Sequence, residues 1–256
     1  MRFIWVSLQH KLKKLIDGRG WQSAKQHTRR ILRPPRFPLS TDRVIATIDR
    51  DRFEQIRKRY WIDNPGDDPP KYLELERWVD INIRRVRDLE LDLSRPKRVL
   101  DLGCGTGYFL HICRLLGHQI LGLDVDELPM FNEITRLLDI PRIVCRIDRF
   151  TALPDLGDKF DVITGFLICF NRHKQGDIWG VPEWDFFLDD LTKHLTRGGL
   201  VWLELNREYD DTYYTPELHD FFKYRGAKVD KQRVIFSEAI ERRTPNVQHP
   251  TPRAGC

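Results

Sequence analysis

The fold of this chain is decided by the stretch Arg98-Val99-Leu100-Asp101-Leu102-Gly103-Cys104-Gly105-Thr106-Gly107-Tyr108. It reads as a short buried strand, a turn with three glycines, and the start of an amphipathic helix that continues to Leu116. Glycine lets the backbone adopt positive φ and leaves no Cβ between the main chain and a ligand. The unpaired N–H groups at the start of the helix favour a carboxylate at the same point.

A second predicted strand, residues 119–123, follows this helix and ends at Asp124. A carboxylate at the end of that strand is placed to accept hydrogen bonds from the two vicinal hydroxyls of a ribose. The strand, helix and strand therefore predict a nucleotide site. A dinucleotide-binding turn would need its third glycine at Tyr108. This chain instead carries Asp101 two positions before the first glycine, and an extra carboxylate there suits a ligand with an ammonium group.

In these residues the chain resembles the class I S-adenosylmethionine-dependent methyltransferases, whose first motif has the form D-x-G-x-G-x-G. The resemblance extends over roughly residues 72–205. It implies an α/β, Rossmann-like fold, with a doubly wound, mostly parallel seven-stranded sheet and an N-terminal helical extension. It also implies S-adenosylmethionine as cofactor, held by a set of residues along the first four strands: Asp101, Gly103, Cys104, Gly105, Gly107, Asp124, Val125, Asp148, Arg149 and Phe166.

The later elements are predicted from periodicity and from glycine and proline signals. Asp148 follows the third predicted strand, and the resemblance places an acidic residue here near the adenine amino group. Asp161, at the start of the fourth strand, is interpreted as a structural residue. The predicted helices are 41–60, 71–91, 127–138, 183–195 and 216–224, and the predicted strands after the second are 142–147, 159–166, 200–205, one near 228 and 233–236.

The length of 256 residues supports one domain of good size with appendages. We expect four parts: a basic amphipathic arm and linker (1–40), a helical cap or lid (41–96), a methyltransferase domain (97–240) and a disordered tail (241–256). The arm carries ten lysines and arginines against one aspartate, and the whole chain has a net charge of +5. Residues 41–256 are therefore net acidic, which weakens the case that this part binds nucleic acid.

No run of apolar residues approaches the length that crosses a bilayer, and the first eight residues are too short for a signal-peptide core. Five cysteines, an odd number without C-x-x-C spacing, argue against a disulfide framework and against a zinc site. We therefore expect a cytoplasmic chain without a metal. Residues 1–17 are expected to form an amphipathic helix, which lies either on its own domain or a partner, or on the inner face of an anionic membrane.

The acceptor of the methyl group is expected beyond the carboxyl ends of the strands, where the strand order reverses. A long loop, residues 167–183, follows the fourth strand there. His173 in this loop is the candidate general base because its unperturbed pKa lies near neutrality, and Asn171 is the candidate orienting group. Both also fit ordinary structural roles. Three further residues are candidates for contacting the acceptor, with ordinary packing as the alternative: Tyr60, Trp179 and Glu183.

The sequence thus favours methyl transfer to oxygen or nitrogen of a small-molecule, glycan or lipid-linked acceptor. The Asn/Asp-Pro-Pro-aromatic motif of some amine methyltransferases does not occur, since the corresponding region reads Gly165-Phe166-Leu167-Ile168. Methylation of a nucleobase amine is therefore disfavoured. Two alternatives stay open: methylation of RNA or protein guided by the basic arm, and binding of S-adenosylmethionine without catalysis.

Overall fold

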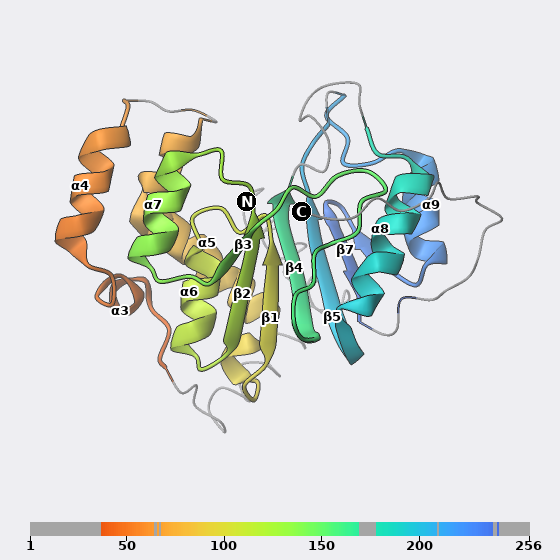
Figure 1. Cartoon of the computed structure of the whole chain (residues 1–256), viewed down its shortest axis with the longest axis horizontal. Coiled ribbons are helices and arrows are strands. Elements are labelled where there is room, and N and C mark those ends of the chain that lie inside the picture. The colour runs from red at the N-terminus through yellow and green to blue at the C-terminus, as the bar shows by residue number, and fades with distance from the viewer. Residues whose placement is uncertain are drawn as a thin grey trace, which may run out of the picture.

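Seven strands form one sheet at the centre of the chain (Figure 1). The computed structural model describes residues 37–63, 66, 68–168, 178–208, 210–237 and 240. The strand order is β3-β2-β1-β4-β5-β7-β6, and only the pairings of β7 are antiparallel. The strands are β1 (Arg98–Leu102), β2 (Gln119–Asp124), β3 (Arg142–Val144), β4 (Phe160–Ile168), β5 (Leu195–Leu205), β6 (Lys228–Asp230) and β7 (Arg233–Phe236). This is the predicted doubly wound, Rossmann-like sheet.

Helices cover both faces of the sheet because its parallel strands are apolar on both sides. Along β1, Val99 belongs to one buried cluster and Leu100 to the other. The first cluster includes residues of α3 to α7, and the second includes residues of α8 and α9. The helices are α3 (Thr41–Ile45), α4 (Arg50–Tyr60), α5 (Leu75–Asp88), α6 (Tyr108–Leu115), α7 (Pro129–Leu137), α8 (Val181–Lys193) and α9 (Pro216–Tyr224), with the 3₁₀ helices η1 (Pro69–Leu73) and η2 (Leu91–Leu93).

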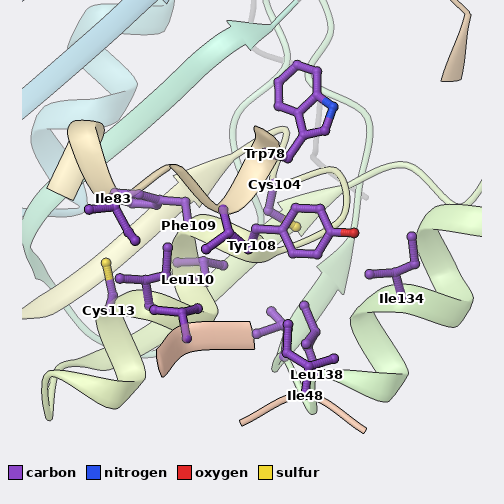
Figure 2. Packing of buried hydrophobic residues seen from close by; sticks show 14 of the residues in the cluster. Ile48, Trp78, Ile83, Cys104, Tyr108, Phe109, Leu110, Cys113, Ile134 and Leu138 are labelled. Carbon is purple, nitrogen blue, oxygen red and sulfur yellow. The ribbon is translucent and has the colours of Figure 1, made fainter. Parts of the chain in front are cut away.

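Helix α6 lies at the middle of the first cluster (Figure 2). Its residues Leu110 and Ile112 are 0% exposed, and burying each side chain stabilises the fold by about 1.5–3 kcal/mol. Helix α5 contacts α6 and presents apolar residues at the spacing of one helix face, among them Val79, Ile83 and Val86. The glycine turn at the start of α6 is thereby fixed against the rest of the fold.

Several boundaries differ from the sequence prediction. The predicted helix 41–60 is two helices, because Asp49 caps α4 by accepting a hydrogen bond from Arg52 N. Pro69 and Pro70 open the 3₁₀ helix η1, so α5 begins at Leu75. Strand β3 ends three residues early, and β5 begins at Leu195, five residues before the predicted start at 200. Helix 216–224 and strand 233–236 are confirmed.

In the part of the chain that the structure describes, none of the helices offers a hydrophobic stretch of membrane-spanning length. The predicted amphipathic helix 1–17 and the predicted disordered tail 241–256 lie outside the described residues.

Candidate active site

A cleft of about 270 Å³ opens at the carboxyl ends of β1, β2 and β4, where the strand order reverses. Helix α5 and η1 form its other wall. Its lining residues are Tyr72, Trp78, Asn82, Arg85, Asp101, Gly103, Cys104, Gly105, Thr106, Tyr108, Phe109, Leu123, Asp124, Val125, Phe131, Cys145, Arg146, Ile147, Phe166, Leu167 and Ile168.

The glycine turn forms the floor of this cleft. Gly103 and Gly105 have φ values of 67° and 54°, a region that side chains other than glycine rarely adopt. A Cβ on Gly103 would lie 3.0 Å from the side chain of Ile168. The turn is tied to β2, because Gly103 N donates to Leu123 O at 2.7 Å. The backbone is therefore held where a ligand approaches it closely.

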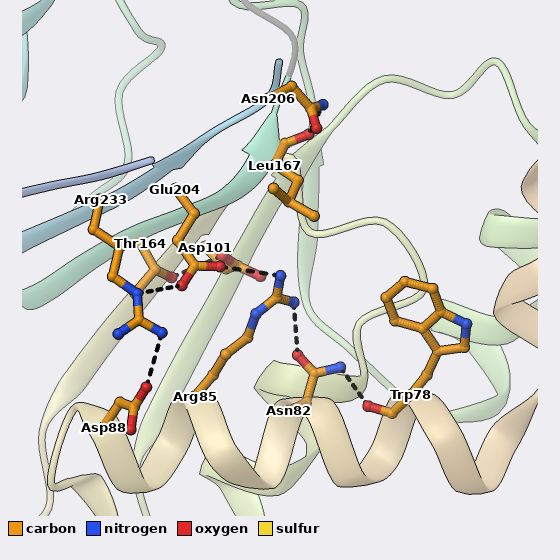
Figure 3. A network of polar contacts seen from close by, with 10 residues as sticks. All are labelled: Trp78, Asn82, Arg85, Asp88, Asp101, Thr164, Leu167, Glu204, Asn206 and Arg233. Atoms are coloured by element: carbon orange, nitrogen blue, oxygen red, sulfur yellow. Dashed lines mark hydrogen bonds and ion pairs between the residues drawn. The ribbon is translucent and has the colours of Figure 1, made fainter. Parts of the chain in front are cut away.

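Asp101 and Arg85 bring opposite charges to the same part of the cleft (Figure 3). Asp101 is 3% exposed and accepts a 2.7 Å hydrogen bond from Thr164 Oγ1. Burial raises the pKa of Asp101 to about 7, while the bond from Thr164 and the charge of Arg85 act to lower it. Burial lowers the pKa of Arg85, and the charges of Glu204 and Asp101 act to raise it.

The Arg85 guanidinium is fixed from three directions. Its Nη1 donates to Asn82 Oδ1 at 3.1 Å, and its Nη2 donates to Glu204 Oε2 at 3.3 Å. Its central carbon lies 4.2 Å from the ring centroid of Phe166. Glu204 also accepts a 3.2 Å bond from Arg233, so the buried carboxylate is paired with two guanidiniums. Arg85 is therefore held rigidly at the cleft.

Asp124 lies at the end of β2, where the sequence placed it. Its Oδ2 accepts from Gly105 N at 2.5 Å and its Oδ1 accepts from Val125 N at 2.7 Å. Burial raises the pKa of Asp124, while the two backbone bonds and the charge of Arg142 act to lower it. The carboxylate is thus oriented toward the glycine turn.

The structure brings most of the predicted cofactor residues to this cleft. Those that line it are Asp101, Gly103, Cys104, Gly105, Asp124, Val125 and Phe166. Their roles toward a cofactor remain predictions. Burial also raises the pKa of the Cys104 thiol, which leaves it protonated and unreactive at neutral pH.

Three of the predicted cofactor residues do not line the cleft. Gly107 instead allows close packing, because a Cβ there would lie 2.8 Å from the side chain of Ile140. Because β3 ends at Val144, the chain has left the sheet before Asp148, whose carboxylate accepts a local 2.8 Å bond from Arg149 N. Arg149 donates to Ile178 O at 3.3 Å. Cys145, Arg146 and Ile147 occupy this side of the cleft.

The three predicted acceptor contacts also have structural partners away from the cleft. The Tyr60 hydroxyl donates to Glu133 at 2.8 Å on α7. Trp179 is 3% exposed and packs edge-to-face against Trp184. Glu183 caps α8, since its Oε2 accepts from Gly180 N at 2.9 Å. These residues stabilise the fold around the site and do not line it.

The predicted catalytic residues His173 and Asn171 lie outside the described residues. Asp161 is structural as interpreted, since it accepts bonds from Arg98 N at 2.9 Å and from Thr196 Oγ1 at 3.2 Å. Cys145 is disulfide-bonded, a single bridge that the cysteine count did not predict. An odd count without short spacing argues against a framework of several bridges and says little about a single one.

Sequence reasoning missed Arg85 and Asn82. A signal was present, because Trp78, Asn82 and Arg85 are spaced i, i+4 and i+7 and therefore share one helix face. Two polar residues on a stripe that is otherwise buried indicate a polar site beneath it. Their partner Glu204 lies 119 residues after Arg85 along the chain, a pairing that no local pattern reveals.

Comparison with known proteins agrees with this geometry. A family model described as a methyltransferase domain matches residues 75–176. A ubiquinone biosynthesis O-methyltransferase of Chelativorans sp. (strain BNC1) is 26% identical over 174 residues, with 62% of each chain covered. An 18S rRNA (guanine-N(7))-methyltransferase of Bos taurus is 30% identical over 145 residues, covering 54% of this chain and 50% of the relative.

Among solved structures, an amino pentose methyltransferase from Micromonospora echinaspora, CalS10, is 25% identical. The match covers 50% of each chain with a TM-score of 0.37. This chain thus spans between half and two thirds of the length of these relatives. With the strand order, the glycine turn and the family match together, we conclude that the chain carries a class I, S-adenosylmethionine-dependent methyltransferase domain.

Proposed function

We propose that this protein transfers the methyl group of S-adenosylmethionine to oxygen or nitrogen of a small-molecule, glycan or lipid-linked acceptor. The observation that carries the proposal is that Asp101 and Arg85 line the same cleft, together with Asp124 at the end of β2. Opposite charges side by side suit an amino-acid zwitterion, and the carboxylate of Asp124 suits a ribose. S-adenosylmethionine carries both groups.

The donor set fits this cofactor. Arg85 would hold the carboxylate, since a guanidinium has five N–H donors and, among the described residues, Arg85 donates to Asn82 and Glu204. Asp101 would face the ammonium group, and Asp124 the ribose hydroxyls. Bound there, S-adenosylmethionine supplies an electrophilic methyl group on a sulfonium. Tyr72, whose ring lies 5.3 Å from that of Phe131, lines the cleft and would help to exclude water.

His173 as general base and Asn171 as orienting group remain part of the proposal. A base is needed because a hydroxyl or ammonium acceptor must lose a proton when it is methylated. A small-molecule acceptor is supported by the relative that is named as an O-methyltransferase of ubiquinone biosynthesis. The cytoplasm remains the proposed compartment, with residues 1–17 on the domain or on the inner face of the membrane.

The experiment uses S-adenosylmethionine labelled at its methyl group, incubated with the protein and an extract of its host. Lipid, glycan, nucleic acid, protein and small-molecule fractions are then separated, and Asp124→Ala serves as the control. Label in the small-molecule, glycan or lipid fraction with the intact protein supports the proposal. Cofactor binding without label in any fraction favours a binding protein without catalysis.

A second candidate is RNA methylation, favoured by the ten basic residues among the first forty and by the relative named as an rRNA methyltransferase. It predicts affinity for RNA that falls steeply with salt and is lost when residues 1–40 are deleted. Label in the nucleic acid fraction would select it over the first proposal.

A further inference from the structure

Strand β4 ends in an irregular backbone at the wall of the cleft. Leu167 has a φ of 56°, a conformation that a side chain other than glycine rarely adopts and that costs about 1–3 kcal/mol. The pairing with β5 shifts register between Phe166 and Ile168, which marks a bulge. Such a conformation persists only where the surroundings impose it.

The side chain of Asn206 fixes this bulge. Asn206 follows the last residue of β5, and its Nδ2 donates to Leu167 O at 2.6 Å (Figure 3). The bulge presses Ile168 against Gly103 in the glycine turn and leaves Leu167 36% exposed. Both residues line the cleft. The hydrogen bond therefore determines the shape of this wall.

The same wall separates the cleft from a smaller crevice of about 20 Å³. Ile168 and Asn206 line this crevice together with Tyr213 and Tyr214 from the loop after β5. In the proposed function, Asp124 faces the ribose of the cofactor, and Asp101 and Arg85 face its ammonium and carboxylate groups. The wall at Leu167 and Ile168 is then the one that faces the methyl group.

We propose that Asn206 is a positioning residue for methyl transfer, which holds the end of β4 in its bulged conformation and so sets where the acceptor meets the methyl group. The inference rests on the proposed function. In methyl transfer the acceptor atom, the methyl carbon and the sulfur must lie in line. A misplacement of the acceptor by about 1 Å lowers the rate on the order of 10²-fold. Asn206 is not among the described residues that line the cleft, and it acts through Leu167.

The test variant is Asn206→Asp, which keeps the shape of the side chain but offers no N–H donor at neutral pH. We expect methyl transfer into the labelled acceptor fraction to fall about 10–100-fold, while S-adenosylmethionine affinity measured by calorimetry stays within about threefold. Amide hydrogen exchange at Leu167 and Ile168 should accelerate about tenfold or more, because the bulge is released.

A second substitution gives the rescue. Asn tolerates positive φ far better than Leu and has a similar length, so Leu167→Asn in the Asn206→Asp background should slow the amide exchange at Ile168 again. Thr212→Val is the matched control, since it removes a 2.7 Å bond to Asp210 in the same loop without touching Leu167. It should transfer at the wild-type rate.

Wild-type exchange and transfer in Asn206→Asp would overturn the inference and leave the proposed function standing. Parallel loss of stability, cofactor affinity and transfer without rescue by Leu167→Asn would also overturn it, because that is the behaviour of a merely structural residue. A wild-type protein that labels no fraction would overturn the proposed function, and the positioning role with it.

Discussion

Each oxygen of the Asp124 carboxylate accepts one backbone hydrogen bond, and each keeps a second lone pair for a ribose hydroxyl. We expect Asp124→Ala to weaken S-adenosylmethionine binding by about 1–3 kcal/mol, measured by calorimetry, because hydrogen bonds to a charged acceptor are lost. Asp158→Ala is the control, since the Asp158 side chain is 63% exposed and pairs with Arg98 outside the cleft. Unchanged affinity in Asp124→Ala would remove the ribose assignment.

Asp101 makes both stability and cofactor binding depend on pH. Its pKa rises from 3.8 to about 7 on folding, so the folded chain holds this proton more tightly than the unfolded chain. The free energy of unfolding should therefore fall as the pH rises from about 4 to about 7, and Asp101→Asn should abolish this part of the fall. Urea denaturation at several pH values measures it.

The cofactor's ammonium group favours the ionised form of Asp101, so binding should release a proton near pH 7 and tighten as the pH rises through 7. Calorimetry in two buffers of different ionisation enthalpy counts the proton. The charges of Arg85 and Asp124 also act on the Asp101 carboxyl. The variant Asp101→Asn keeps Arg85 and Asp124, and it should bind the cofactor without releasing a proton. Proton uptake by the wild-type protein would contradict the assignment.

At the scale of elements, α8 and α9 are joined by a buried charge. Arg225 is 1% exposed and pairs with Asp185, which is also buried, and with Asp189 at 2.6 Å. We expect Arg225→Met to lower the free energy of unfolding by about 3–5 kcal/mol, because the buried carboxylate of Asp185 loses this guanidinium. Urea denaturation measures this change, and cofactor affinity at low urea should not change.

The matched control for that experiment is Arg98→Met, which breaks a pair with Asp158 that is largely exposed. Its cost should be at most about 1 kcal/mol, as is typical of surface ion pairs. Equal destabilisation by the two substitutions would show that burial does not determine the strength of the α8–α9 contact.

Local patterns predicted the elements whose signals lie within a few residues. The glycines and Asp124 mark the turn and the second strand end, and Thr215 with Pro216 marks the start of α9. The predicted end of β3 was wrong because Cys145 and Ile147 continue the apolar pattern of the strand after its pairing with β2 has ended. Glu183 was assigned to the acceptor although its spacing from Gly180 also fits a helix cap.

At the scale of the molecule, the described residues that line the cleft all fall between 72 and 168. We therefore expect deletion of residues 1–36 to leave S-adenosylmethionine affinity unchanged in calorimetry, while Phe37 and Leu39 keep their packing against the first core cluster. Weaker cofactor binding after the deletion would show that the arm contributes to the cleft.

The parts of the site that the sequence did not reveal are those that depend on the whole molecule. Arg85 on α5 meets Glu204 on β5, and Asp88 on the same helix pairs with Arg233 on β7, 145 residues later. These contacts exist only once the sheet has assembled. Trp179 was predicted to contact the acceptor, yet tertiary packing buries its side chain against Trp184 and Phe187.

The link between α5 and β7 has a consequence for synthesis on the ribosome. A nascent chain that has emerged only as far as β4 already contains the glycine turn, Asp124 and Arg85, but neither Glu204 nor Arg233 to fix the guanidinium. Such long-range contacts form late. The contacts that fix the Arg85 guanidinium are thus complete only after β5 and β7 have been synthesised and have joined the sheet.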